Sequence, residues 1–243
     1  MNKRKWIFGN LFDGVTLQSL LGDLSHAVSL ERLGPKLTKR VFWRAATNEP
    51  MIALTFDDGP QITYTPRLLD ILNQFDVPAT FFLIGRHIES HFELARKIGQ
   101  ADHEVGNHTF THAAMFRLTD EEMRHEIVRT DELLRSLDGA EPRFLRPPMG
   151  LFTKRVLDIV EQSGYKTVVG DVYPRDSHLP GKEKIVHRIL TRVITGSIII
   201  LHDGGNSLNI DRTQTLDAVR EFIPQLKSRG FKFVKLSQLL AMR

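Results

Sequence analysis

The chain has 243 residues, no cysteine and a net charge of +4, with 41% hydrophobic and 26% charged residues. This composition is typical of a globular protein and excludes a wholly disordered, collagen-like or coiled-coil chain. Without cysteine, disulfides are impossible and any metal site must use His, Asp or Glu. The sequence contains no run of about 18 apolar residues, which excludes a membrane-spanning helix.

The net charge is concentrated in the first forty residues, which contain seven basic and three acidic side chains. The remainder is nearly neutral, which argues against a nucleic-acid-binding core. A basic segment can contact a membrane surface or an anionic polymer, although such runs are more often solvated. We therefore predict a basic N-terminal extension over residues 1–41 and one larger domain over residues 42–243, and the oligomeric state stays open.

The N-terminus does not make a convincing signal peptide. A basic start at Met1–Lys5 precedes an apolar run, Trp6–Phe12, that is short and interrupted by Gly9 and Asn10. Signal peptides carry a cleaner apolar stretch of roughly 7–15 residues. An amphipathic surface helix over Leu17–Leu30 fits better, so the extension is expected to be partly helical. A cytoplasmic location is favoured, with the cell envelope as the alternative.

From residue 51 onward, short β-rich runs alternate with helical stretches. The predicted strands are Met51–Phe56, Thr80–Ile84, His103–Asn107, Phe144–Arg146, Lys166–Asp171, Ser197–His202 and Phe231–Leu236. The predicted helices are Pro66–Phe75, Glu121–Leu137, Phe152–Gln162, Ile185–Val193 and Thr213–Lys227, the last of them kinked at Pro224. This alternation predicts an α/β fold with a parallel sheet of about seven strands.

Titratable side chains follow most of these strands. They are Asp57 and Asp58 after the first, His108 and His112 after the third, Arg146 on the fourth, Asp171 and Asp176 after the fifth, and His202 and Asp203 at the sixth. Because the active sites of parallel α/β sheets lie at the carboxyl ends of the strands, we expect these groups to meet at one edge.

Two adjacent carboxylates, Asp57 and Asp58, stand before a turn formed by Gly59 and Pro60. Adjacent side chains of a strand point in different directions. One carboxylate can therefore ligate a metal while the other accepts a proton. The plain alternative is a polar turn, because Asp, Gly and Pro dominate turns for local reasons.

His108 and His112 lie four residues apart, and one helical turn would bring both imidazoles to the same face. His87 and His91 have the same spacing, but they lie within a helical stretch and are expected to be exposed. Asp58 with His108 and His112 makes a set of two histidines and one carboxylate that leaves positions open for water. Such a set is typical of a catalytic metal.

The remaining candidates complete a hydrolytic set. Arg146 precedes a rigid turn formed by Pro147 and Pro148, and its guanidinium can hold a carboxylate. His202 ends a buried strand and is suited to act as a general acid. Asp176 or Asp171 can set its protonation state. Together these residues indicate metal-assisted hydrolysis of an amide or ester.

Four segments then resemble a known family in both content and order: Thr55–Pro60, His108–His112, Arg146–Gly150 and Ile200–His202. They are similar to successive motifs of the NodB-homology polysaccharide deacetylases, carbohydrate esterase family four. The resemblance runs from about residue 42 to the C-terminus. It implies a distorted (β/α) barrel that removes N-acetyl groups from N-acetylglucosamine-containing polysaccharide or oligosaccharide, of the peptidoglycan or chitin type.

The resemblance also implies a role for each site residue. By the family pattern, Asp57 is the general base, and Asp58, His108 and His112 bind a divalent metal, usually zinc, with cobalt or similar ions possible. His202 is the general acid, Arg146 orients Asp57, and Asp176 pairs with His202 or Arg146. Thr109 steadies the histidine loop. The backbone N–H of Met149, in the turn that begins at Pro147, stabilises the oxyanion.

Two positions depart from the family pattern. Met149 stands where the family usually has an aromatic residue, and Ser177 stands where it usually has tryptophan. Both changes alter the expected wall of the substrate pocket. They leave a metal-dependent hydrolase of a small non-sugar amide as an alternative. An inactive carbohydrate-binding module is the second alternative.

Overall fold

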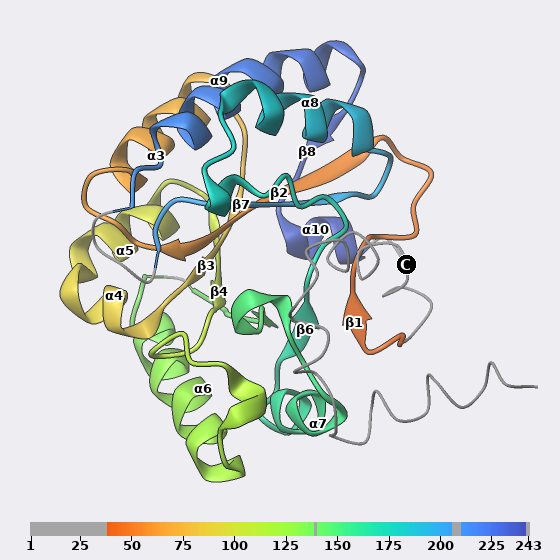
Figure 1. Cartoon of the computed structure of the whole chain (residues 1–243). Coiled ribbons are helices and arrows are strands. Elements are labelled where there is room, and N and C mark those ends of the chain that lie inside the picture. Colours follow the sequence, from red (N-terminus) through yellow and green to blue (C-terminus); the bar gives the residue numbers. More distant parts are fainter. Residues whose placement is uncertain (1–37, 139, 206–209, 242–243) are drawn as a thin grey trace, which may run out of the picture.

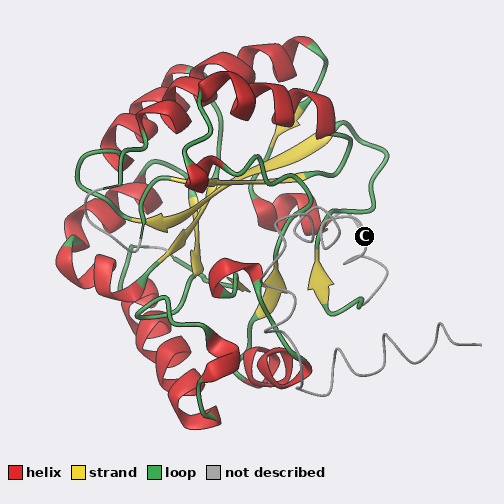
Figure 2. Ribbon diagram, in the orientation of Figure 1, coloured by secondary structure: helices red, strands yellow, loops and turns green. Residues whose placement is uncertain are grey.

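A computed structural model describes residues 38–138, 140–205 and 210–241, so the predicted helix over Leu17–Leu30 lies outside the described residues. The strands form one curled parallel sheet, and most of the helices lie on its outside (Figures 1 and 2). They are β1 (Val41–Phe42), β2 (Met51–Gly59), β3 (Thr80–Leu83), β4 (Glu104–Asn107), β5 (Phe144–Leu145), β6 (Lys166–Val168), β7 (Ile198–His202) and β8 (Lys232–Phe233). Their order is β1-β6-β5-β4-β3-β2-β7, with β8 beside β2. The predicted distorted barrel of about seven parallel strands is confirmed.

The described α-helices are α3 (Thr65–Gln74), α4 (Gly85–Ser90), α5 (Phe92–Gln100), α6 (Asp120–Arg135), α7 (Lys154–Gln162), α8 (Lys182–Arg192), α9 (Thr213–Ser228) and α10 (Leu236–Ala241). Short 3₁₀ turns are η1 (Met115–Arg117), η2 (Pro148–Gly150) and η3 (Asp176–His178). The final predicted strand is too long, because α10 already begins at Leu236. None of the helices in these described ranges is long and apolar enough to cross a bilayer.

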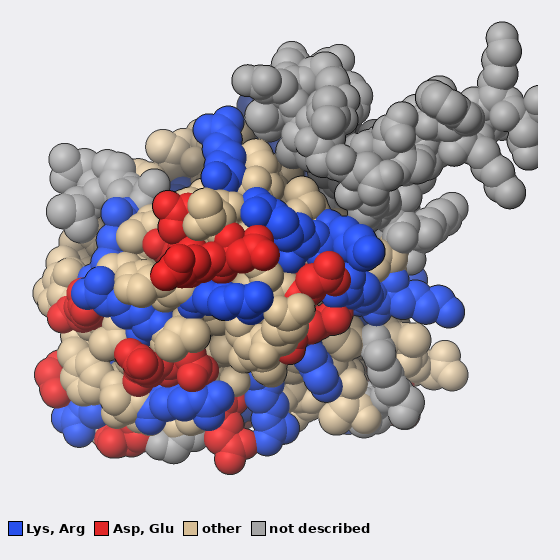
Figure 3. All heavy atoms as spheres, turned by 90° about the horizontal axis from the view of Figure 1, so that it is seen from below, with Lys and Arg blue, Asp and Glu red and all other residues tan. Residues whose placement is uncertain are grey.

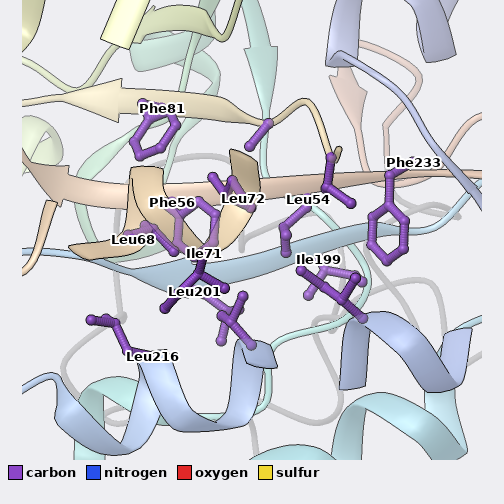
Figure 4. Packing of buried hydrophobic residues seen from close by; sticks show 14 of the residues in the cluster. Leu54, Phe56, Leu68, Ile71, Leu72, Phe81, Ile199, Leu201, Leu216 and Phe233 are labelled. Carbon is purple, nitrogen blue, oxygen red and sulfur yellow. The ribbon is translucent and has the colours of Figure 1, made fainter. Parts of the chain in front are cut away.

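A large apolar core fixes the central strands. Leu54 and Phe56 of β2 and Leu201 of β7 are fully buried against α3 and α9, where Leu68 and Leu216 cover them (Figure 4). Burying a side chain of this kind stabilises the fold by about 1.5–3 kcal/mol. The core therefore holds β2 and β7 side by side, and with them the residues at their carboxyl ends.

The first described residues belong to this body. Val41 and Phe42 pair with β6, and the guanidinium of Arg40 lies 2.8 Å from both Asp158 and Glu161 on α7. On the face shown in Figure 3, acidic and basic side chains lie interspersed rather than gathered into areas of one sign.

Candidate active site

The carboxyl ends of β2 and β7 bring two candidate residues side by side. Asp57 is the register partner of His202 in the parallel ladder. β2 extends to Gly59, so both aspartates lie inside the strand rather than after it. The pairing with β3 shifts between Asp57 and Gly59, and Asp58 has a left-handed φ of 72°. This irregularity directs the two carboxylates to different partners, as their adjacency predicts.

Asp58 meets the two histidines in a compact group. Its Oδ1 lies 3.4 Å from Nε2 of His108 and 3.3 Å from Nε2 of His112. One ligand atom from each residue lies within 4.8 Å of the others. Oδ1 of Asp58 is buried without a hydrogen-bond partner in the described structure. A buried, unpartnered carboxylate oxygen facing two imidazoles fits a divalent metal.

The ring of His108 is held by its other nitrogen. Nδ1 lies 2.7 Å from the carbonyl oxygen of Arg146, so an Nδ1–H donates to that carbonyl and leaves the lone pair on Nε2. A hydrogen bond of this kind fixes both the tautomer and the orientation of a metal-binding imidazole. The turn after β5 thereby orients a residue at the end of β4.

Protonation states in this group suit a cation. Burial, with a further contribution from His108, lowers the pKa of His112 to about 4. Burial opposes ionisation of Asp58, but the neighbouring imidazoles outweigh it and its pKa lies below the ordinary value. Near neutral pH the carboxylate is therefore charged and His112 is neutral, which are the forms that bind metals.

The histidine segment is not a helical turn, so that part of the prediction is wrong. Residues 108–112 form a loop in which Thr109 (φ 64°) and His112 (φ 62°) are left-handed. Thr109 contributes through its backbone: its N–H donates to the side chain of Asn107 at 2.9 Å, and its carbonyl accepts from Gly85 at 3.0 Å. The hydroxyl of Thr109 is buried without a partner in the described structure.

The expectation that His87 and His91 are exposed is also wrong. Both are half-buried, and Nδ1 of His87 lies 2.9 Å from the backbone carbonyl oxygen of Asp58. The side chain of His87 therefore supports the strand segment that carries Asp58.

Asp57 forms a buried ion pair with Arg146. Nη1 of the guanidinium donates to Oδ1 of Asp57 at 2.6 Å and to the hydroxyl of Thr55 at 2.8 Å. The guanidinium also lies over the ring of Phe82, 4.2 Å from its centroid. Removing one member of a buried pair typically costs about 3–5 kcal/mol because the remaining charge is left unpaired. The pair holds Asp57 in one orientation.

His202 is paired with Asp176. Nδ1 lies 2.9 Å from Oδ1 of Asp176, and Oδ2 of the same carboxylate accepts the backbone N–H of His202 and the hydroxyl of Thr215. Burial lowers the pKa of His202, but Asp176, with Asp58 and Asp57, outweighs burial and raises it to about 9. His202 is therefore protonated near neutral pH and can donate a proton from Nε2.

Asp171 lies away from this edge, contrary to the prediction that it ends a strand there. β6 stops at Val168, and Asp171 accepts from the hydroxyl of Ser197 at 3.1 Å and the N–H of Ile198 at 2.9 Å, at the amino end of β7. Of the two carboxylates weighed for His202, Asp176 is the one in contact with it.

The site residue that sequence reasoning left without a role is Asp203. It is fully buried and accepts a 2.5 Å hydrogen bond from Thr65, while its Oδ1 has no partner in the described structure. Burial raises its pKa to about 7. A Cβ at Gly59 would lie 2.6 Å from the carboxylate, so only glycine fits there. The position of Asp203 directly after a buried strand was the sequence signal that could have predicted its place in the site.

The rim of the site carries Met149 and Tyr173. Met149 is left-handed (φ 61°) and 58% exposed, whereas Pro147 before it is buried. The ring centroid of Tyr173 lies 6.0 Å from that of His202, and its hydroxyl contacts Ser177. The aromatic side chain beside His202 therefore comes from Tyr173, although Ser177 replaces the expected tryptophan.

Comparisons with known proteins match this chain to one family. The polysaccharide deacetylase family model matches residues 44–168. A peptidoglycan-N-acetylglucosamine deacetylase of Bacillus cereus is 38% identical over 84% of this chain and 94% of its own length. A chitooligosaccharide deacetylase of a Bradyrhizobium species is 39% identical over 77% of this chain and 90% of its own length.

Solved structures of the same family are also similar to this chain. The Bc1960 peptidoglycan N-acetylglucosamine deacetylase, crystallised with a naphthyl N-hydroxybenzamide, has a TM-score of 0.79 and 31% identity over 84% of this chain and 94% of its own. BA3943, a CE4 family pseudoenzyme of Bacillus anthracis, has a TM-score of 0.77 and 28% identity over 85% of this chain and 71% of its own. The chain belongs to the polysaccharide deacetylase family.

Proposed function

We propose that this protein is a metal-dependent hydrolase that removes N-acetyl groups from N-acetylglucosamine-containing polysaccharide or oligosaccharide. The observation that carries the proposal is the meeting of two functional groups at one sheet edge. One is the cluster of Asp58, His108 and His112. The other is the carboxylate of Asp57, paired with Arg146, beside the protonated imidazole of His202. Relatives named as peptidoglycan and chitooligosaccharide deacetylases support the substrate class.

Asp58, His108 and His112 are the residues we assign to a divalent cation, zinc first and cobalt as an alternative. When bound, such a cation polarises the acetyl carbonyl and makes water easier to deprotonate. Asp57 then acts as the general base and takes a proton from water. Arg146 keeps the carboxylate of Asp57 in place. General-base catalysis by a positioned side chain contributes typically about 10²–10⁴-fold.

His202 supplies the proton that the departing amine needs. Its Nδ1–H donates to Asp176, so the proton on Nε2 is available to the amide nitrogen as the C–N bond breaks. The backbone N–H of Met149 is the donor we assign to the developing oxyanion. Pro147 shapes the turn that carries this donor, and Thr109 holds the histidine loop through its backbone.

We place this activity in residues 42–243 and give residues 1–41 no part in the chemistry. Contact with a membrane surface or an anionic polymer remains the role we propose for the basic N-terminal residues 1–40. The seven basic side chains of that segment support the assignment.

Acetate release from N-acetylglucosamine oligomers by the purified protein tests the proposal. We expect release to stop with a chelator and to return with added Zn²⁺ or Co²⁺. Release only from small non-sugar acetamides would contradict the sugar substrate and favour the alternative that Met149 and Ser177 raise. Oligomer binding without any acetate release would indicate an inactive module, the state named for BA3943.

A further inference from the structure

Helix α6 carries a carboxylate on its buried face. Met123, Ile127 and Thr130 are fully buried there, and Glu126 lies between them with only 8% of its surface exposed. A buried carboxylate is costly unless hydrogen bonds or charges compensate for the lost water. The contacts of Glu126 therefore indicate why an acid stands among apolar residues.

Both carboxylate oxygens of Glu126 accept hydrogen bonds from Thr111. Oε2 accepts the backbone N–H of Thr111 at 2.7 Å, and Oε1 accepts its hydroxyl at 2.7 Å. Thr111 directly precedes His112. A second contact joins the same helix to the loop, because the amide of Asn107 donates to the carbonyl of Ile127 at 3.0 Å. Helix α6 thus holds residues 107–111 at both ends.

Different contacts hold the three residues assigned to the metal. The ring of His108 is held by its hydrogen bond to the carbonyl of Arg146. Asp58 is held by its place in β2 and by the contact of His87 with its backbone carbonyl. In the described part of the chain, the ring of His112 makes no hydrogen bond, and its ion-pair and ring contacts are with Asp58 and His108. The backbone of His112 is also left-handed, a conformation that persists only where the surroundings impose it.

We propose that Glu126 is a positioning residue that sets the affinity of the site for its divalent cation by holding Thr111 and, through it, His112. The inference rests on the metal site of the proposed function. Residues that orient metal ligands typically change metal affinity or activity by about 10–100-fold when they are replaced. Glu126 makes no hydrogen bond or ion pair with Asp58, His108 or His112 in the described structure, so we expect its effect to pass through the loop.

The test measures Zn²⁺ affinity by competition with a chromogenic chelator, together with the visible absorption of the Co²⁺-loaded protein. Glu126→Ala is expected to weaken Zn²⁺ binding by about 10–100-fold and to alter the Co²⁺ spectrum. Glu126→Gln can still accept the N–H of Thr111 and donate to its hydroxyl, so it should stay within a few-fold of the wild type. Glu132→Ala removes an exposed acid from the same helix and should bind like the wild type.

These measurements distinguish the role of Glu126 from the existence of the metal site. Unchanged Zn²⁺ affinity and an unchanged Co²⁺ spectrum in folded Glu126→Ala would overturn the role of Glu126 while leaving the metal site intact. Wild-type protein that binds no Zn²⁺ would contradict both. If Glu126→Ala does not fold, Thr111→Val removes the hydroxyl donor alone. It must then weaken Zn²⁺ binding, and an unchanged affinity would equally overturn the inference.

Discussion

Charged side chains at the carboxyl ends of the parallel strands differ in burial from an ion pair near the amino end of β5. At the carboxyl ends, Asp57, Arg146, Asp176 and Asp203 are almost fully buried and held by hydrogen bonds and charge pairs. Near the amino end of β5, Glu141 and Arg143 form an ion pair whose side chains are 74% and 64% exposed. Exposed pairs contribute about 0–1 kcal/mol, whereas burying a charge costs several kcal/mol before any compensation.

The free-energy cost of burying charge therefore falls at the carboxyl ends of the strands. The apolar core between β2, β7 and the helices α3 and α9 provides the stability that offsets a buried ionic edge. Charges kept at such a cost indicate chemistry rather than stability. We therefore expect substitutions of Asp57 and Asp176 at the carboxyl ends to change the reaction, and substitutions at the amino ends to leave it unchanged.

The largest effect is expected for Asp57→Asn. The variant lacks the general base, so acetate release should fall by about 10²–10⁴-fold, while Zn²⁺ binding through Asp58 and the histidines persists. Steady-state kinetics and Zn²⁺ competition measure the two properties separately. Loss of Zn²⁺ together with activity would show that Asp57, too, belongs to the metal site.

Asp176→Asn should shift the pH dependence. Because Asp176 raises the pKa of His202 to about 9, the wild type should keep its proton donor up to that pH and lose activity above it. In the variant the alkaline limb of kcat should move by one or more pH units toward acid. The same sign applies to stability: the contribution of protonated His202, complete below about pH 6.5, is lost as the pH rises through 9.

Asp171→Asn is the matched control, since that carboxylate contacts Ser197 and Ile198 instead of His202. Its alkaline limb should coincide with that of the wild type. A limb that shifts in Asp171→Asn but not in Asp176→Asn would reverse the assignment.

Asp203→Asn should change stability more than mechanism. The pKa of Asp203 is raised to about 7, so the folded state holds a proton that the unfolded chain loses near pH 4. This group therefore lowers the free energy of unfolding as the pH rises from about 4 to 7. The variant should lack that loss, a relative gain of up to roughly 4 kcal/mol at 1.36 kcal/mol per pKa unit. Urea unfolding at several pH values measures it, and parallel pH profiles would contradict the buried carboxyl.

The smallest effect is expected at the amino end. Glu141→Gln breaks the exposed pair with Arg143, so the free energy of unfolding should change by less than about 1 kcal/mol and acetate release should not change. Thermal unfolding and the acetate assay check both. A large loss of activity would contradict the contrast between the two ends.

The positions of the candidate residues were predictable from the sequence wherever the order of strands and loops along the chain determines them. Asp57, Asp58 and His202 end strands whose apolar runs are unmistakable, and parallel strands bring such ends together. Asp171 was misplaced because periodicity does not reveal where a strand stops. β6 ends at Val168, and the chain then passes the amino end of β7.

Residues that contact a distant segment of the chain were harder to predict from the sequence. Glu126 stands in a helix rich in acids, and only its position on the apolar face with Met123, Ile127 and Thr130 distinguishes it from its exposed neighbours. Its partner, Thr111, belongs to a loop whose left-handed residues no spacing rule predicts. The short β1 at Val41–Phe42 was missed as well, because two residues carry no periodic signal.

The decisive experiment on the metal site is X-ray diffraction from Zn²⁺-soaked crystals at the zinc absorption edge. We expect one strong anomalous peak in contact with the Asp58 carboxylate and with Nε2 of both His108 and His112. A fully soaked crystal with no peak at these three atoms, or with its zinc bound elsewhere, would contradict the assignment of this edge as the metal centre.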